Sequence, residues 1–267
     1  MAIAVISGLA GIDAGIGGLS VRSHSALRVL ALGAILVVIR LRMGVGDVSA
    51  WLFRMALLTV IALSAGSWLR FLLTTIGGAD SYGYVSASQL LRSGRLVHPE
   101  PITEWLSAAN RLTLASPLGW APAADASGIV PIYPLGLPLV MALFSVVAGA
   151  NAVFFVAPVL ALATLLLVHR LARETFDRDS ALMAAALVAC NPVFVAYAKQ
   201  PMSDVPATLW VSLATLMAMR TSRGSSLLAG VAAGVAVITR PALVIAAAAT
   251  CVTRPIALAV LAVMVAI

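Results

Sequence analysis

The sequence predicts an all-α, polytopic transmembrane helical bundle with a long extracytoplasmic first loop that contains juxtamembrane helices. The first observation is composition: 62% of the 267 residues are hydrophobic and 10% are charged, whereas soluble domains carry about 25% charged residues. The second is a mean hydropathy of +1.07, which is typical of membrane proteins. The third is a series of apolar runs separated by short basic loops, the positive-inside pattern. That pattern accounts for the formal charge of +7, so we expect no nucleic-acid partner.

The first long apolar run, residues 51–73, is long enough to cross a bilayer. Residues 26–39 before it are short for a span, which leaves a tilted helix, a helix extended by its flanks or an interfacial helix. Residues 1–20 lack a basic start, so they make a poor signal peptide. Arginines gather at the amino-terminal side of the long run, and the positive-inside rule places them in the cytoplasm: Arg40, Arg42 and Arg54. The helix therefore runs outward, and Asp80 emerges on the outer face.

A polar-mixed loop follows, from about residue 74 to residue 134. Long loops translocate largely regardless of their charge, so its charged residues do not contradict an outer location. Within it, residues 85–91 predict one or two amphipathic turns on the membrane surface. Residues 131–149 are apolar for only about ten positions after Pro138, so we expect a re-entrant or interfacial segment rather than a span.

Two spans follow and determine which side of the membrane the next loop occupies. Residues 150–168 form a good span that leads into the basic sequence HRLARETFDRDS, which we place in the cytoplasm. Residues 180–197 return outward, so the loop that carries Lys199 and Asp204 lies outside. If residues 135–148 spanned the membrane, the basic sequence would lie outside and Asp204 inside, an arrangement that the charge rule disfavours.

The remaining chain predicts short, closely packed helices. Residues 205–219 run inward, and residues 227–238 are rich in Gly and Ala, which lets helices approach closely in lipid. Residues 227–238 and residues 242–252 each end at a Thr-Arg-Pro sequence. These two segments are either paired short helices or one long helix interrupted by Pro241. The sequence stops inside an apolar run, so we expect a piece of a longer protein.

Two acids stand at the outer ends of predicted spans, Asp80 and Asp204. Acids at a membrane edge cost free energy and are candidates for function, so we expect both to take part in catalysis. The alternative for each is an N-cap: Asp80 for the helix that follows it, and Asp204 for a helix with Pro206 in its first turn. Capping and catalysis do not exclude each other.

Basic and aromatic side chains on the same side are candidates for substrate binding. Lys199 and Arg240 either supply fixed positive charge for a phosphate or snorkel at helix ends. Three tyrosines either hydrogen-bond a sugar or phosphate or only anchor helices at the interface: Tyr82, Tyr84 and Tyr133. His98 and His169 have no companion ligand at metal-binding spacing, so the sequence predicts no metal site.

These features follow one another in an order that resembles a known family. An outward span leads into D-x-Y-x-Y and A-x-x-L-x-x-G, with the Gly here one residue beyond the usual gap. A long loop then leads to Y-P-x-G, and later come N-P, D-x-P and a Gly/Ala-rich helix that ends T-R-P. The residues are Asp80, Tyr82, Tyr84, Ala87, Leu90, Gly94, Tyr133, Pro134, Gly136, Asn191, Pro192, Asp204, Pro206, Thr239, Arg240 and Pro241. Over residues 50–255 the chain resembles the membrane glycosyltransferases of the GT-C fold, in particular the family-39 branch related to protein O-mannosyltransferases and lipid A aminoarabinose transferase.

The resemblance implies one transmembrane glycosyltransferase domain over residues 1–267, incomplete, in the cell membrane with its active site on the extracytoplasmic side. It implies transfer of a hexose or pentose from a polyprenyl-phosphate donor in the membrane lipid to a hydroxyl of a lipid, glycan or protein, and we expect inversion at the sugar. Asp80 maps onto the catalytic base, Asp204 onto the second outer acid and Arg240 onto the basic residue near the lipid phosphate. Many members carry Asp-Glu where this chain has Asp80 and Ser81. We expect no cofactor, and a divalent metal stays an open alternative.

The alternative function is that of a non-enzymatic membrane protein, either transporter-like or an inactive truncated remnant. Transporters carry ionisable residues at mid-span, often beside broken helices. Here the acids stand at span ends, and only the break at residues 239–241 fits a transporter. Asp80 and Asp204 facing one outer cavity would favour the enzyme, and a central polar path between two related halves would favour transport.

Overall fold

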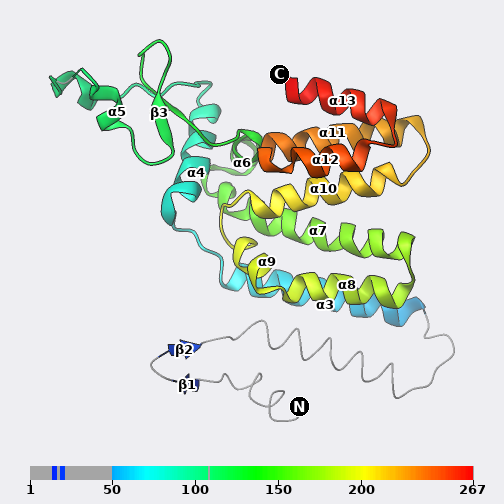
Figure 1. Cartoon of the computed structure of the whole chain (residues 1–267). Helices are drawn as coiled ribbons and strands as arrows, with labels where there is room; N and C mark the ends of the chain where they lie inside the picture. The colour runs from blue at the N-terminus through cyan, green and yellow to red at the C-terminus, as the bar shows by residue number, and fades with distance from the viewer. Residues whose placement is uncertain (1–13, 17–18, 22–49, 108, 267) are drawn as a thin grey trace. The chain divides into compact units, whose positions relative to one another are not determined.

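The computed structural model describes residues 14–16, 19–21, 50–107 and 109–266, and most of this part of the chain is helical (Figure 1). The helix predicted at residues 26–39 and most of residues 1–20 lie outside the described residues. The chain divides into two compact units. The first comprises Met1–Phe71 and Leu162–Ala196, and the second comprises Leu72–Ala161 and Tyr197–Ile267.

The first unit contains packed helices and a small pair of strands. Its described elements are β1 (Ala14–Ile16), β2 (Leu19–Val21), α3 (Ala50–Arg70), the second half of α7 (Val153–Thr175), α8 (Arg178–Cys190) and most of α9 (Pro192–Tyr197). β1 and β2 pair antiparallel, and α3 packs against α8. The Trp68 and Phe194 rings meet edge to face with their centroids 5.9 Å apart, which joins α3 to α9.

Two helices in the described part of the chain are long and apolar enough to cross a membrane, Trp51–Arg70 and Ala150–Thr175. Both coincide with predicted spans, which confirms that helices form there. α7 continues past the predicted end at Val168, and an ion pair between Arg170 and Glu174 at 3.1 Å supports its last turns. The prediction of a loop over the sequence HRLARET was therefore wrong.

The helical run predicted over residues 180–197 is broken into α8 and α9 at Asn191. Pro192 has no N–H with which to continue the hydrogen-bond ladder of α8. The side-chain oxygen of Asn191 accepts hydrogen bonds from the N–H groups of Val193 and Phe194, both at 3.0 Å. Asn191 therefore caps the new helix.

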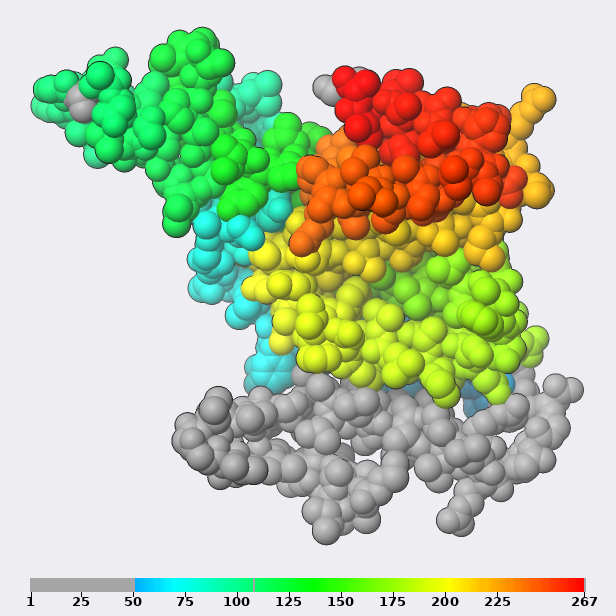
Figure 2. Space-filling view, viewed as in Figure 1, coloured from blue at the N-terminus to red at the C-terminus, as the bar shows by residue number. Residues whose placement is uncertain are grey.

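The second unit contains a group of four short helices that pack together (Figure 1). They are α10 (Asp204–Ala218), α11 (Arg223–Thr239), α12 (Val244–Cys251) and α13 (Pro255–Ala266), with the 3₁₀ turn η3 (Pro241–Leu243) between α11 and α12. Their shared core is mostly alanine, and together they form the surface that runs from yellow to red in Figure 2. Of the two predicted alternatives, paired short helices are confirmed, because the chain turns at Pro241 and does not continue as one long helix.

Glycine lets α11 and α13 approach closely. A Cβ at Gly230 would overlap the carbonyl oxygen of Ala257 and the side chain of Val260. A Cβ at Gly234 would overlap the side chain of Met264. The prediction that small residues in this helix permit close packing is therefore confirmed.

We expect Gly230→Ala to destabilise the protein. The added methyl group collides with the backbone of α13, and overpacking of this kind costs about 1–3 kcal/mol, whereas Ala gains roughly 1 kcal/mol over Gly in helix propensity. Gly224→Ala in the same helix is the matched control, because nothing lies within 4 Å of its Cβ position. Thermal unfolding in detergent, followed by circular dichroism, measures both variants. A midpoint that rises for Gly230→Ala as much as for Gly224→Ala would contradict the close approach.

A second core in this unit joins α4 (Gly78–Arg92), α6 (Gly136–Ala148) and the start of α7. α4 begins well before the predicted turns at residues 85–91. Its last residue is Arg92, and Gly94 follows the C-cap with φ +71°, while the N–H of Arg95 donates to the Leu90 carbonyl at 3.1 Å. α6 has 13 residues, and its rise of about 20 Å is less than the roughly 30 Å of bilayer hydrocarbon. Its re-entrant or interfacial location stays a prediction.

The connection between α4 and α6 contains strands as well as helices, which corrects the all-α expectation. Its elements are η1 (Pro101–Trp105), α5 (Arg111–Ala115), β3 (Trp120–Pro122) and β4 (Ile129–Pro131), and η2 (Ala150–Ala152) follows α6. β3 and β4 pair antiparallel, and His98 bridges to Ile129. The strands end at prolines, which disfavour a helix there. Asp125 closes the turn between them by accepting hydrogen bonds from the N–H of Ser127 at 3.1 Å and from its hydroxyl at 2.6 Å.

Candidate active site

Asp80 lies in the first turn of α4 and does not cap it. Gly77 occupies the N-cap position without a side-chain hydrogen bond, so the capping alternative for Asp80 was wrong. The carboxylate of Asp80 is exposed and accepts a hydrogen bond from the Tyr133 hydroxyl, with 2.7 Å between the two oxygens. Negative charge is favourable in the first turn because the free N–H groups of the helix point toward it.

The Tyr133 ring is held between two glycines. A Cβ at Gly83 of α4 or at Gly119 before β3 would overlap the ring, and Gly119 has φ +88°, a conformation that favours glycine. The Tyr84 ring lies beside it, with centroids 5.1 Å apart and planes tilted by 49°. The hydrogen bond to Asp80 raises the pKa of Tyr133 to about 12, with further contributions from burial and from the charges of Asp80 and Tyr84.

Tyr84 connects this pair of tyrosines to the second predicted acid. Its buried hydroxyl donates to the hydroxyl oxygen of Ser203 at 3.0 Å, and Ser203 is the N-cap residue of α10, directly before Asp204. Burial raises the pKa of Tyr84, the hydrogen bond to Ser203 lowers it, and the charges of Asp80, Arg240 and Asp204 also act on it. Tyr84 therefore lies within electrostatic reach of both acids and of Arg240.

Asp204 and Arg240 form an ion pair where α10 begins and α11 ends. Ser203 takes the N-cap position of α10, so the capping alternative for Asp204 was wrong. A cation is favourable at the carboxyl end of α11 because the free carbonyl groups point toward it. The side chain of Arg240 is 45% exposed and that of Asp204 is 29% exposed, so the ion pair is partly open to solvent.

α6 brings the segment of Tyr133 next to the segment of Arg240. A Cβ at Gly136 would overlap the backbone and hydroxyl of Thr239, the residue before Arg240. On the other side, the Ser81 hydroxyl contacts the Sδ atom of Met202 at 3.5 Å, so α4 also touches the chain before α10. These contacts bring five predicted residues into one cluster, which we call the acid–tyrosine cluster: Asp80, Tyr84, Tyr133, Asp204 and Arg240.

Two predicted site residues form no side-chain hydrogen bond, ion pair or ring contact with this cluster in the described part of the chain. Tyr82 is 41% exposed and points away from Tyr84, since residues two apart on a helix differ in direction by about 200°. Lys199 contributes its backbone carbonyl, which accepts a hydrogen bond from the N–H of Leu73 at 3.0 Å. Roles for Tyr82 and Lys199 as substrate ligands stay predictions.

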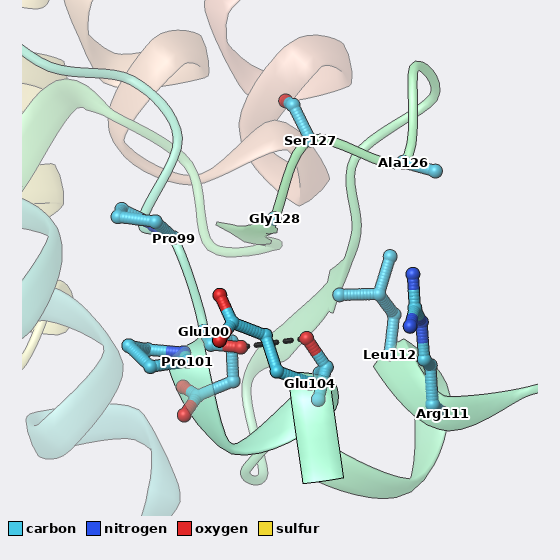
Figure 3. A pocket seen from close by; sticks show the side chains of 10 residues that line it. Pro99, Glu100, Pro101, Glu104, Arg111, Leu112, Ala126, Ser127 and Gly128 are labelled. Atoms are coloured by element: carbon cyan, nitrogen blue, oxygen red, sulfur yellow. Dashed lines mark hydrogen bonds between the residues drawn. The ribbon is translucent and has the colours of Figure 1, made fainter. Parts of the chain in front are cut away.

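A separate cavity of about 160 Å³ lies in the connection between α4 and α6 (Figure 3). Two carboxylates, one guanidinium and two hydroxyls line it, from Glu100, Glu104, Arg111, Thr103 and Ser127. No predicted site residue lines it, so the acid–tyrosine cluster stays the candidate site. Among the described residues, no group of three or more His, Cys, Asp or Glu side chains could hold a metal ion.

Sequence reasoning did not single out Ser203, Gly83 or Gly119, although each shapes the cluster. A signal for Ser203 exists, because Ser before Asp-Val-Pro is typical of a helix start with Ser at the N-cap. No local signal marks the two glycines, since both contact a tyrosine from another segment of the chain.

A family model described as dolichyl-phosphate-mannose-protein mannosyltransferase matches residues 130–265. The match covers just over half of the chain and includes Tyr133, Asp204 and Arg240, whereas Asp80 lies before it. No curated protein and no solved structure matches the chain. The family match confirms the predicted resemblance, and the chain belongs to the dolichyl-phosphate-mannose-protein mannosyltransferase family of glycosyltransferases.

Proposed function

We propose that this chain transfers a sugar from a polyprenyl-phosphate donor to an acceptor hydroxyl at the outer face of the membrane, with Asp80 as the base. The observation that carries the proposal is the cluster itself, in which an exposed carboxylate lies near the Asp204–Arg240 ion pair. Family membership supports it, because the family is described by mannose transfer from dolichyl phosphate to protein. We therefore take mannose as the first sugar and a protein hydroxyl as the first acceptor to test.

The proposed reaction is an inverting displacement at the anomeric carbon. The acceptor oxygen attacks this carbon from the face opposite the phosphate and forms the new carbon–oxygen bond. The bond between the carbon and the phosphate oxygen breaks, and its electron pair leaves with the phosphate. Asp80 takes the proton of the acceptor hydroxyl, and general-base help of this kind contributes about 10²–10⁴-fold. The lipid phosphate is a stable anion, so no general acid is needed.

We assign Arg240 to the leaving phosphate. A guanidinium binds phosphate through N–H groups in a fixed plane, and the exposed part of the Arg240 side chain keeps such groups accessible. Asp204 holds the guanidinium in place through the ion pair. Charge that develops on the phosphate then meets a cation that is already oriented.

We place the cluster on the extracytoplasmic side of the cell membrane, in a single glycosyltransferase domain whose outer loop, about residues 74–134, supplies Asp80, Tyr84 and Tyr133. α3 is long and apolar enough to cross, and the positive-inside rule puts Arg54, near its start, in the cytoplasm. Residues 71–77 connect α3 to α4, so Asp80 follows soon after the chain leaves the membrane. α4 buries Tyr84 and Val85 in the core that it shares with α6 and the start of α7, and we propose that it lies along the membrane surface.

The positions of the charged residues favour an enzyme over a transporter. Asp80 lies in the first turn of α4, Asp204 in the first turn of α10, and Arg240 directly after α11. Asp80 and Asp204 therefore lie at helix starts, whereas transporters often place ionisable residues at mid-span. Only Arg240, at the break after α11, also fits a transporter.

The proposal is tested with the chain reconstituted in lipid vesicles, a short-chain polyprenyl phosphate that carries radiolabelled mannose, and a peptide rich in Ser and Thr. We expect label on peptide hydroxyls and an equal amount of released polyprenyl phosphate. Label on a lipid or glycan instead would keep the reaction and change the acceptor. If a protein shown to be folded transfers sugar from this donor to none of these acceptors, the proposal is overturned.

A further inference from the structure

We propose that Tyr133 is a positioning residue for Asp80, acting on the carboxylate rather than on the sugar. The inference rests on the proposed function, because it requires Asp80 to act as the base. Its basis is the hydrogen bond from the Tyr133 hydroxyl to one oxygen of the Asp80 carboxylate, at 2.7 Å. It replaces the role predicted from the sequence, which was direct binding of a sugar or phosphate.

The Tyr133 hydroxyl can donate one hydrogen bond, and the Asp80 carboxylate accepts that bond. A sugar or phosphate oxygen that needed this proton would have to break the bond to Asp80. The bond occupies one carboxylate oxygen, Oδ1, and leaves Oδ2 to receive the proton of the acceptor. An exposed aspartate rotates about its side-chain bonds, and a base must be held in the reactive geometry to be efficient. The tyrosine supplies that restraint.

The Tyr133 hydroxyl can hold the Asp80 carboxylate in one orientation because neighbouring residues fix the position of the Tyr133 ring. Gly83 and Asp80 are three positions apart on α4, so they lie on the same face of the helix. The Tyr133 ring lies against Gly83 and therefore places its hydroxyl at the level of Asp80. Gly119 also lies against the Tyr133 ring. The Tyr84 ring packs beside the Tyr133 ring, with 5.1 Å between the two ring centroids.

The first test compares steady-state kinetics of wild type and Tyr133→Phe in vesicles with polyprenyl-phosphate mannose and the Ser/Thr-rich peptide. Tyr133→Phe keeps the ring between the glycines and removes only the hydroxyl. We expect kcat to fall about 10-fold, as for the loss of a hydrogen bond to a charged group, while both KM values stay within about 2-fold of wild type. A raised KM with unchanged kcat makes Tyr133 a substrate ligand and overturns the positioning role. Unchanged kinetics overturn it as well.

Two further variants make this test specific. Tyr197→Phe is the matched control, because the Tyr197 hydroxyl makes no hydrogen bond in the described part of the chain, and we expect wild-type kcat. Gly83→Ala keeps the Tyr133 hydroxyl but places a methyl group where the ring lies, while Ala suits a helix better than Gly. We expect Gly83→Ala to lower kcat as Tyr133→Phe does, and a wild-type kcat would overturn the role of the ring.

Asp80→Asn separates this inference from the proposed function. Absence of transfer by the wild-type protein overturns the proposed function, and a fully active Asp80→Asn overturns the assignment of Asp80 as the base. An inactive Asp80→Asn beside a fully active Tyr133→Phe overturns only the positioning role. Ultraviolet titration after a rapid pH jump tests the contact without a donor, with the Tyr133 transition assigned by its loss in Tyr133→Phe. The hydrogen bond to Asp80 raises the pKa of Tyr133 to about 12, so Asp80→Ala, which removes both the charge and the acceptor oxygen, should lower this pKa toward its ordinary value. An unchanged transition overturns the contact.

Discussion

Asp80→Asn is expected to reduce sugar transfer by about 10²–10⁴-fold while the protein stays folded in the membrane. The neutral amide is a far weaker base than a carboxylate, so the acceptor hydroxyl attacks without general-base help. The amide oxygen can still accept the hydrogen bond that the Tyr133 hydroxyl donates. Because Asp80 is exposed and caps nothing, we expect little change in the free energy of unfolding.

Initial rates with labelled polyprenyl-phosphate mannose, at equal amounts of reconstituted protein, measure this loss. Asp125→Asn is the matched control, because Asp125 is also an exposed carboxylate in the connection between α4 and α6. Its hydrogen bonds go to Ser127 in its own turn. Wild-type rates for Asp80→Asn would show that another group takes the acceptor proton, and the assignment of the base would then be wrong.

The long apolar runs were sufficient to predict where most helices lie. Residues 51–73 and 150–168 both fall largely within observed helices, because a continuous apolar run in lipid must satisfy its backbone internally. The same reasoning predicted that α7 ends at the first charged residues, which was too early. A helix continues through charge where pairs four residues apart support it, as Arg170 and Glu174 do. Hydropathy thus locates the lipid-facing part of a helix and not its end.

The short strands β3 and β4 could not be predicted, because three residues are too few to show the alternation of a strand. Helix geometry also separated two tyrosines that the motif D-x-Y-x-Y grouped. In an extended loop Tyr82 and Tyr84 would share a face, but α4 begins at Gly78 and includes both. Only Tyr84 is therefore buried in the cluster.

The candidate site residues could be predicted from the sequence, but the contacts between them could not. Tyr133 and Asp80 are 53 positions apart, and Arg240 and Asp204 are 36 positions apart. Each pair depends on packing between elements, and for Tyr133 that packing requires glycine at position 83. A contact of this kind leaves no periodic pattern in the chain, so the order of the motifs indicated the residues and not their partners.

Arg240→Gln is expected to lower kcat/KM for the donor by about 10²-fold, the loss typical of removing one preorganised group that stabilises developing charge. Glutamine is polar and similar in reach but carries no charge for the leaving phosphate. Arg223→Gln is the matched control, because Arg223 lies at the opposite end of the same helix. Arg240→Lys should recover part of the activity, since it keeps the charge and loses the planar arrangement of N–H groups.

The loss in Arg240→Gln should not come from unfolding. Both partners of the ion pair are partly exposed, and exposed pairs contribute only about 0–1 kcal/mol to stability. Thermal unfolding in detergent should therefore give similar midpoints for wild type and Arg240→Gln. A large drop in the midpoint together with the loss of activity would mean that the pair holds α10 against α11, and its assignment to the phosphate would lose its support.

A double-mutant cycle decides whether Asp204 acts through Arg240. Asp204→Asn leaves the guanidinium charged but unoriented, so we expect a milder loss of about 10-fold in kcat. If Asp204 only orients Arg240, the double variant Asp204→Asn/Arg240→Gln loses no more activity than Arg240→Gln alone, because the group being oriented is already gone. Fully additive losses would instead mean that Asp204 contacts the acceptor or donor independently, as a second catalytic acid of the site.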